Sequence, residues 1–137
     1  MQPLMDIPPH LLTDVYWSFA QPVPASPEAL IDAAATYATD IEASNPESVL
    51  RKRLPFADLM VRYSHWVRES GGKWQEREVE HHVIGATGGL TGAELLWEIH
   101  VACNATTGQG DHHFFEGLDR VRDGTSDKPV FRVALGS

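Results

Sequence analysis

A glycine-rich turn between two strand-like segments constrains this chain more than any other feature. Ser70-Gly71-Gly72-Lys73 separates residues 59–67 from residues 74–84, and apolar and polar side chains alternate through much of the first segment. Alternation with a period of two is typical of a β-strand. Adjacent glycines accept the positive φ angles that tight hairpin turns require. The sequence therefore predicts an antiparallel hairpin in the middle of the chain.

The length of the turn decides which side chains meet across this hairpin. If the two glycines alone form the loop, His65 opposes Glu78 and Tyr63 opposes Glu80, and opposed residues share one face. A four-residue loop about the same centre keeps this register, whereas a three-residue loop shifts it. In the two-residue register neither face of the hairpin is cleanly apolar.

Helix-start signals occur on both sides of the hairpin. Ser26-Pro27-Glu28 combines a capping serine, a proline in the first turn and an acid at the positive end of the helix dipole. Thr91 and Glu94 have the spacing of a capping box. Together with the spacing of apolar residues, these signals predict helices over residues 11–19, 27–44, a short segment between Asn45 and Pro55, and about 92–104.

The C-terminal part of the chain contains one predicted strand and one ambiguous segment. Residues 129–135 alternate as a strand does. Residues 111–121 begin with a possible helix cap, but Gly117 and the adjacent aromatic residues favour a bulged strand. We therefore expect a single α+β domain over residues 1–137. In it, N-terminal helices precede the hairpin, a helix and two further strands, and a curved four-stranded antiparallel sheet is packed by helices on one face.

Charge and cysteine content exclude several functional classes. The formal net charge is −8, which disfavours binding to nucleic acids and to anionic membranes. The chain has one cysteine, Cys103, so it forms no internal disulfide, and its N-terminus lacks a secretory signal pattern. These features predict a cytoplasmic protein, and no motif for a cofactor is present.

Four hairpin residues are candidates for acid–base catalysis: Tyr63, His65, Glu78 and Glu80. A carboxylate beside a histidine favours the protonated imidazole and brings its pKa towards the range useful in catalysis. The competing interpretation is a solvated strand face with an exposed cross-strand pair.

The chain also has seven histidines, and three of them are candidate metal ligands: His82, His112 and His113. Single members of the two adjacent histidine pairs, with His65 or His100 and a glutamate, could approach three-ligand zinc geometry. No His-Glu-x-x-His or Cys-x-x-Cys pattern supports this site. His100 falls beside the apolar stripe of its predicted helix, which indicates a core histidine.

The four tryptophans are candidates for the core, but Trp66 and Trp74 flank the hairpin turn and are alternatively candidate anchors of an interface. The sequence thus favours a small acidic binding module that uses a sheet face for a protein partner or for self-association, most simply as a homodimer. The alternative is a small pocket enzyme that uses the His/Glu/Tyr cluster on a small-molecule ligand, with or without a metal.

Overall fold

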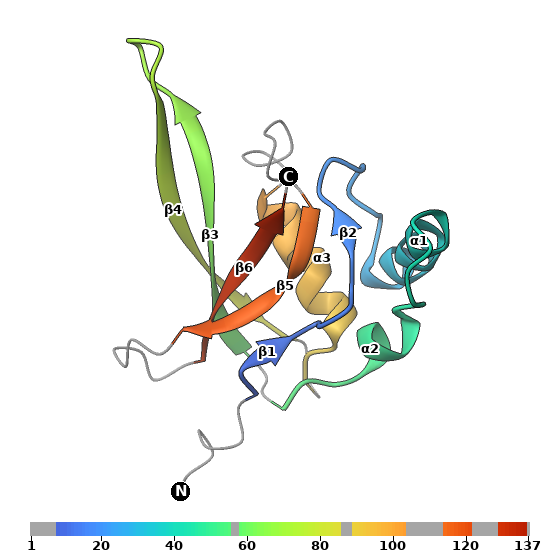
Figure 1. The fold of residues 1–137 in the computed structure, drawn as a ribbon. Helices are drawn as coiled ribbons and strands as arrows, with labels where there is room; N and C mark the ends of the chain where they lie inside the picture. Colours follow the sequence, from blue (N-terminus) through green and yellow to red (C-terminus); the bar gives the residue numbers. More distant parts are fainter. Residues whose placement is uncertain (1–7, 56–57, 86–88, 104–113, 122–128, 137) are drawn as a thin grey trace, which may run out of the picture.

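The computed structural model describes residues 8–55, 58–85, 89–103, 114–121 and 129–136. Helices and strands are mixed along the chain (Figure 1). The helices are α1 (Pro27–Asp40), α2 (Glu47–Arg51) and α3 (Gly92–Cys103). The strands are β1 (His10–Leu11), β2 (Trp17–Ser18), β3 (Asp58–Arg68), β4 (Trp74–Ile84), β5 (Phe114–Val121) and β6 (Val130–Gly136). Within these residues no helix has both the length and the apolar character needed to cross a membrane.

The strands form one six-stranded sheet, with the order β1-β5-β6-β3-β4 and with β2 also paired to β5. The α+β class is confirmed, but the expectation of four strands that are all antiparallel is wrong. β6 pairs in parallel with β3 over the short stretch Met60–Arg62, on the side of β3 opposite β4. Beyond Arg62, β3 diverges from β6 and continues only with β4 (Figure 1).

The first predicted helix, over residues 11–19, is also wrong. Leu12 and Asp14 have positive φ angles of 56° and 65°, which turn the chain between β1 and β2. Both short strands then pair with β5. The apolar residues that produced the helical spacing are nonetheless buried: Leu11, Leu12, Val15, Trp17 and Phe19. Their spacing predicted the core positions correctly, but these residues lie in two short strands and the turns around them rather than in a helix.

The helices predicted from capping signals are confirmed. The Ser26 side chain accepts a hydrogen bond from the Ala29 backbone N–H at 3.1 Å and begins α1. Thr91 Oγ1 accepts from the Glu94 N–H, and Glu94 Oε1 accepts from the Thr91 N–H, so the two residues form a reciprocal capping box. α1 ends at Asp40, earlier than expected, and Glu42 then adopts a positive φ of 60°.

One face of the sheet is covered by α3, and α1 and α2 pack beside this helix (Figure 1). The hairpin contributes Leu59, Val61, Tyr63 and Val83 to the same buried cluster as Leu95 and Ile99 of α3. The Tyr63 hydroxyl donates a hydrogen bond to the Ala102 carbonyl at 3.2 Å, which ties β3 to the end of α3.

The strand interpretation of residues 114–121 is confirmed, and its irregularity lies where Gly117 predicted it. The pairing of β5 with β6 shifts between Phe115 and Leu118, and Gly117 has a φ of 110°. Residues 111–113 lie outside the described part of the chain.

The hairpin itself is confirmed, but its predicted register is wrong. The Glu69 N–H donates to the Lys73 carbonyl and the Gly72 N–H donates to the Glu69 carbonyl, each at 2.8 Å. Residues 70–72 therefore form a three-residue loop, with Gly72 at a φ of 84°. This geometry is a tight turn followed by a glycine bulge, a common alternative to the two-residue hairpin loop. One added loop residue shifts every pairing in the hairpin.

Candidate functional site

The shifted register separates the proposed acid–base residues. His65 pairs with Arg77 rather than with Glu78, and Tyr63 pairs with Val79 rather than with Glu80. Glu78 and Glu80 lie opposite Ser64 and Arg62, on the face that points away from the helices, whereas the Tyr63 side chain is buried on the helix-covered face. The predicted juxtaposition of Tyr63 with the two glutamates is therefore wrong.

The outer face of the sheet is instead a network of ion pairs. One row of residues crosses five strands in register: His10, Asp119, Arg132, Arg62 and Glu80. His10 Nδ1 lies 2.8 Å from Asp119 Oδ1, and Arg62 Nε lies 2.7 Å from Glu80 Oε2. The Arg132 guanidinium donates to the Glu78 carboxylate from across β3. These polar residues lie on the solvated face of the sheet, so the opposite face can pack against the helices without burying them.

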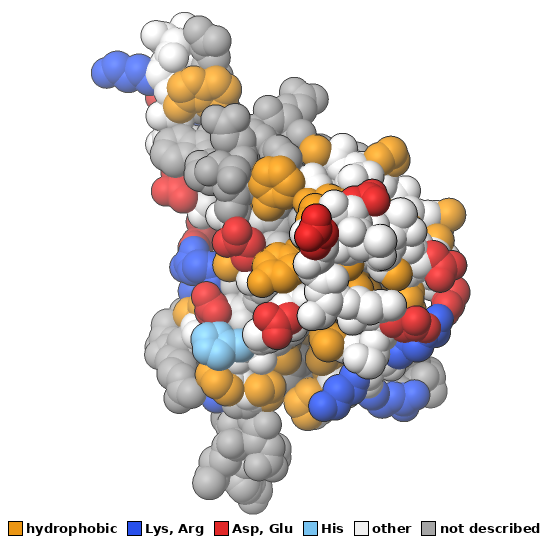
Figure 2. All heavy atoms as spheres, turned by 45° about the vertical axis from the view of Figure 1, so that its right-hand side comes forward, with side chains coloured by type: hydrophobic (Ala, Val, Ile, Leu, Met, Phe, Trp, Pro, Cys, Tyr) orange, Lys and Arg blue, Asp and Glu red, His pale blue; other side chains and the backbone are white. Residues whose placement is uncertain are grey.

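The distal half of the β3–β4 hairpin projects from the body of the molecule, and we call residues 69–78 of this projection the arm. Every residue of the arm is exposed, and the Trp74 side chain on it is 60% exposed. Figure 2 shows the projection rising above the body of the protein. The structure confirms an exposed position for Trp74. The side chain of Trp66 lies outside what the structure describes, although its backbone pairs with Glu76.

β4 is the last strand of the sheet, and among the described residues no strand pairs with its outer edge. The hydrogen-bonded pair of Glu69 and Lys73 fixes the alternation of the ladder. The β4 residues that lie an even number of positions from Lys73 therefore form backbone hydrogen bonds with β3. The backbone N–H groups of Glu76, Glu78 and Glu80 point away from β3, towards the open edge.

The described residues contain no group of three or more histidine, cysteine, aspartate or glutamate side chains arranged to hold a metal ion. His82 Nε2 lies 3.4 Å from Asp58 Oδ1, at the end of the hairpin nearest the body. His112 and His113, the other two candidate ligands, lie outside the described residues. The metal site therefore stays a prediction from sequence.

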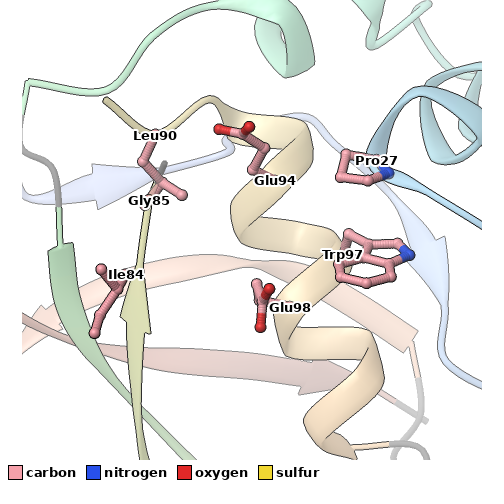
Figure 3. A pocket seen from close by; sticks show the side chains of 7 residues that line it. All are labelled: Pro27, Ile84, Gly85, Leu90, Glu94, Trp97 and Glu98. Carbon is pink, nitrogen blue, oxygen red and sulfur yellow. The ribbon is translucent and has the colours of Figure 1, made fainter. Parts of the chain in front are cut away.

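No motif in the sequence predicted the two neighbouring hollows on another part of the molecule, which together we call the groove. It consists of two hollows of about 280 and 380 Å³ that share Pro27 and Glu94. The first hollow lies between the end of β4 and α3, with Trp97 and Glu98 on the helix side (Figure 3). The second lies between the first turns of α1 and α3 and α2, with Ile31 and Leu50 among its lining residues. The i, i+4 spacing of Glu94 and Glu98 places both on one side of α3, but sequence alone did not place Pro27 beside them.

His100 and Cys103 are buried in the core, as their positions beside the apolar stripe of α3 indicated. His100 Nδ1 accepts a hydrogen bond from the Trp17 indole N–H at 3.1 Å. Burial lowers the pKa of His100, and backbone groups of Gln21 and Phe19 oppose part of this fall. Neither residue opens onto either hollow of the groove, so they are part of the core rather than of a reactive site.

No protein-family model matches the chain, and no curated protein or solved structure matches it significantly.

Proposed function

We propose that this protein is a binding module that captures an extended segment of a protein partner along the outer edge of β4. The observation that carries the proposal is the combination of the exposed arm with an edge strand whose outward N–H groups meet no other described strand. Exposed edges are templates for strand addition, in which backbone hydrogen bonds supply affinity and alternate side chains supply specificity. Trp74 offers a large apolar anchor at the start of this edge.

The charges along the edge favour a basic partner. Glu76, Glu78 and Glu80 alternate along β4 and therefore share one face of the strand. Glu78 and Glu80 already pair with Arg132 and Arg62, so Glu76, which forms no ion pair with another described residue, carries the charge that is not neutralised. A partner strand with lysine or arginine at alternate positions would place opposite charges beside them. The net charge of −8 would also accelerate the encounter with a basic partner.

Self-association along this edge is less favourable than binding to a basic partner. Two copies of β4 related by a two-fold axis would pair antiparallel, so residues of the same face would oppose one another. In registers centred near Glu78, the three glutamates would meet the same glutamates of the second copy. Like charges placed directly opposite destabilise a strand pair.

A peptide of alternating valine and lysine, Ac-Val-Lys-Val-Lys-Val-Lys-NH2, tests the proposal, with the glutamate version as the charge-reversed control. Isothermal titration should show binding of the lysine peptide only. Glu76→Pro removes one outward N–H without removing a hydrogen bond to β3, so it should weaken binding about tenfold. Glu76→Gln keeps the N–H and should have the smaller effect.

Three results would overturn the proposal. Equal binding of the two peptides would exclude the charge preference, and an undiminished affinity of Glu76→Pro would exclude the edge. A stable dimer of the wild-type protein in light scattering, dissociated by Glu76→Pro, would show that the edge serves self-association instead.

A further inference from the structure

We infer that the groove formed by the two hollows is a second binding site, which takes a short peptide segment with a basic side chain in the first hollow and an apolar side chain in the second. This inference does not depend on strand addition at β4. It rests on which side chains line each hollow and on the size of the hollows.

The first hollow has the chemistry of a site for an organic cation. Its lining contains the carboxylates of Glu94 and Glu98, and no lysine or arginine is among the described residues that line it. Figure 3 shows the two carboxylates on successive turns of α3, with Trp97 beside Pro27 on the same side of the hollow. Carboxylates accept hydrogen bonds from ammonium or guanidinium groups, and an indole ring attracts a cation placed over its face.

Two contacts hold these groups in place before any ligand arrives. The Trp97 indole N–H donates to the Pro24 carbonyl at 2.8 Å, which fixes the ring against the segment leading into α1. Glu94 accepts the capping hydrogen bond of Thr91 through Oε1, so its other oxygen keeps its capacity to accept. Glu98 makes no hydrogen bond or ion pair with another described residue, so its full charge is available to a ligand.

The first hollow also suits the stem of a basic side chain. Leu90, Ile84 and Pro27 line it with apolar surface, and Ile84 is exposed although it is a large hydrophobic residue. Lysine and arginine bury their aliphatic stems on such surfaces while the charged group reaches polar atoms. A small inorganic cation would leave this apolar lining unused.

The second hollow differs in charge from the first. Its cation, Arg51, is already paired, with Nη2 at 2.7 Å from Glu28 Oε2 and Nε at 2.8 Å from Glu47 Oε2. The lining includes the buried side chains of Ile31 and Leu50. An apolar side chain is therefore the complementary occupant of this end of the groove.

The presence of two neighbouring hollows with different linings favours a ligand that carries two different side chains. Pockets for drug-sized ligands usually measure about 300–1,000 Å³. The hollows measure about 280 and 380 Å³ and share Pro27 and Glu94 in their linings, so they are neighbours. Two neighbouring hollows of this size can take two side chains of one extended segment, in which residues i and i+2 lie on the same side.

The tripeptide Ac-Arg-Gly-Leu-NH2 is the probe, and the version with norleucine in place of arginine is its neutral control. Titration of the full chain, followed by ¹H–¹⁵N NMR, should shift the indole N–H signal of Trp97 and the amide signals of α3. The neutral peptide should bind at least about fivefold more weakly, the ratio expected from about 1 kcal/mol for a solvent-accessible ion pair. Replacing arginine by lysine should retain binding, since both side chains supply the cation.

Glu98→Gln should reduce the affinity for the arginine peptide by about fivefold. Glu116→Gln, which removes an exposed glutamate on β5 outside the groove, should leave the affinity unchanged. Equal affinities for the arginine and norleucine peptides would overturn the inference. An equal loss of affinity in Glu98→Gln and Glu116→Gln would also overturn it. Shifts confined to residues outside the groove would also overturn it.

The β4 variant separates this site from the one proposed above. Glu76→Pro should leave tripeptide binding intact while it weakens the valine–lysine peptide. Loss of tripeptide binding in Glu76→Pro would mean that the two sites are one, and would contradict the inference of a separate groove.

Discussion

A pH-dependent loss of stability should follow from the buried histidine of α3. His100 has no exposed surface, and its ring packs against Phe19 with the ring centroids 5.1 Å apart. Nδ1 accepts the Trp17 indole N–H, so in the folded protein the neutral ring carries its proton on Nε2. Nε2 is buried without a hydrogen-bond partner among the described residues, and the nearby backbone groups of Gln21 and Phe19 offset only part of the cost of a positive charge. Protonation must therefore place a charge in the core or unfold the protein.

The sign and size of the effect follow from this environment. Burial lowers the pKa of His100 in the folded state, whereas in the unfolded chain a histidine titrates near about 6.5. The unfolded state thus binds more protons below this pH, and stability falls as the pH decreases towards the folded pKa. The loss is at most about 1.4 kcal/mol per pH unit, so lowering the pH from 7.5 to 5.5 should cost about 1 kcal/mol.

Urea unfolding, followed by tryptophan fluorescence at pH 7.5 and 5.5, measures this loss. His100→Gln retains a side-chain acceptor for Trp17 but does not titrate, so it should be less stable at pH 7.5 and should show a smaller difference between the two pH values. His10→Gln alters an exposed histidine and should keep the wild-type difference, apart from its own ion pair with Asp119. An equal pH dependence in the wild type and His100→Gln would refute the reasoning.

Three further substitutions test local features of the fold by equilibrium unfolding. Gly72→Ala should destabilise the protein by about 1 kcal/mol because Gly72 has a φ of 84°. Gly71→Ala should destabilise it less, because an added Cβ at Gly71 meets nothing within 4 Å. Equal losses of stability in the two variants would contradict the three-residue loop. Thr91→Ala should cost about 1 kcal/mol by removing the cap of α3, and an unchanged stability would exclude a role for the cap. Tyr63→Phe should cost about 1 kcal/mol through the lost hydrogen bond to Ala102, with a neutral result contradicting that contact.

Local signals in the sequence predicted the elements that local interactions determine. The cap of Ser26 and the box of Thr91 and Glu94 specify where α1 and α3 begin, because each is satisfied within one helical turn. The bulge at Gly117 was likewise predictable from a glycine among strand-forming residues.

Long-range pairing could not be derived in the same way. The apolar residues from Leu11 to Phe19 have helical spacing, yet β1 and β2 form because β5, about a hundred residues later, supplies their hydrogen-bond partners. The parallel contact of β6 with β3 also depends on tertiary packing that no local motif encodes.

The prediction of the acid–base site depended on the length of the hairpin loop, in which one residue changes every cross-strand pair. Ser70 joins the two glycines in the loop, and this one addition moves Glu78 from His65 to Ser64. Trp74 is exposed, as the interface interpretation of the flanking tryptophans requires, because a position beside the turn does not depend on register. The groove was not predicted, since Pro27, Ile84 and Glu98 meet only in the folded chain.

Amide hydrogen exchange along β4 tests the open edge most directly. In the free protein, the amides of Glu76, Glu78 and Glu80 should exchange rapidly, while those of Arg77, Val79 and His81, which bond to β3, should be protected. Addition of the valine–lysine peptide should protect the three glutamate amides. Slow exchange of these amides in the free protein would show that the edge is already covered, and unchanged exchange in the presence of bound peptide would show that binding occurs elsewhere; either result would contradict the account.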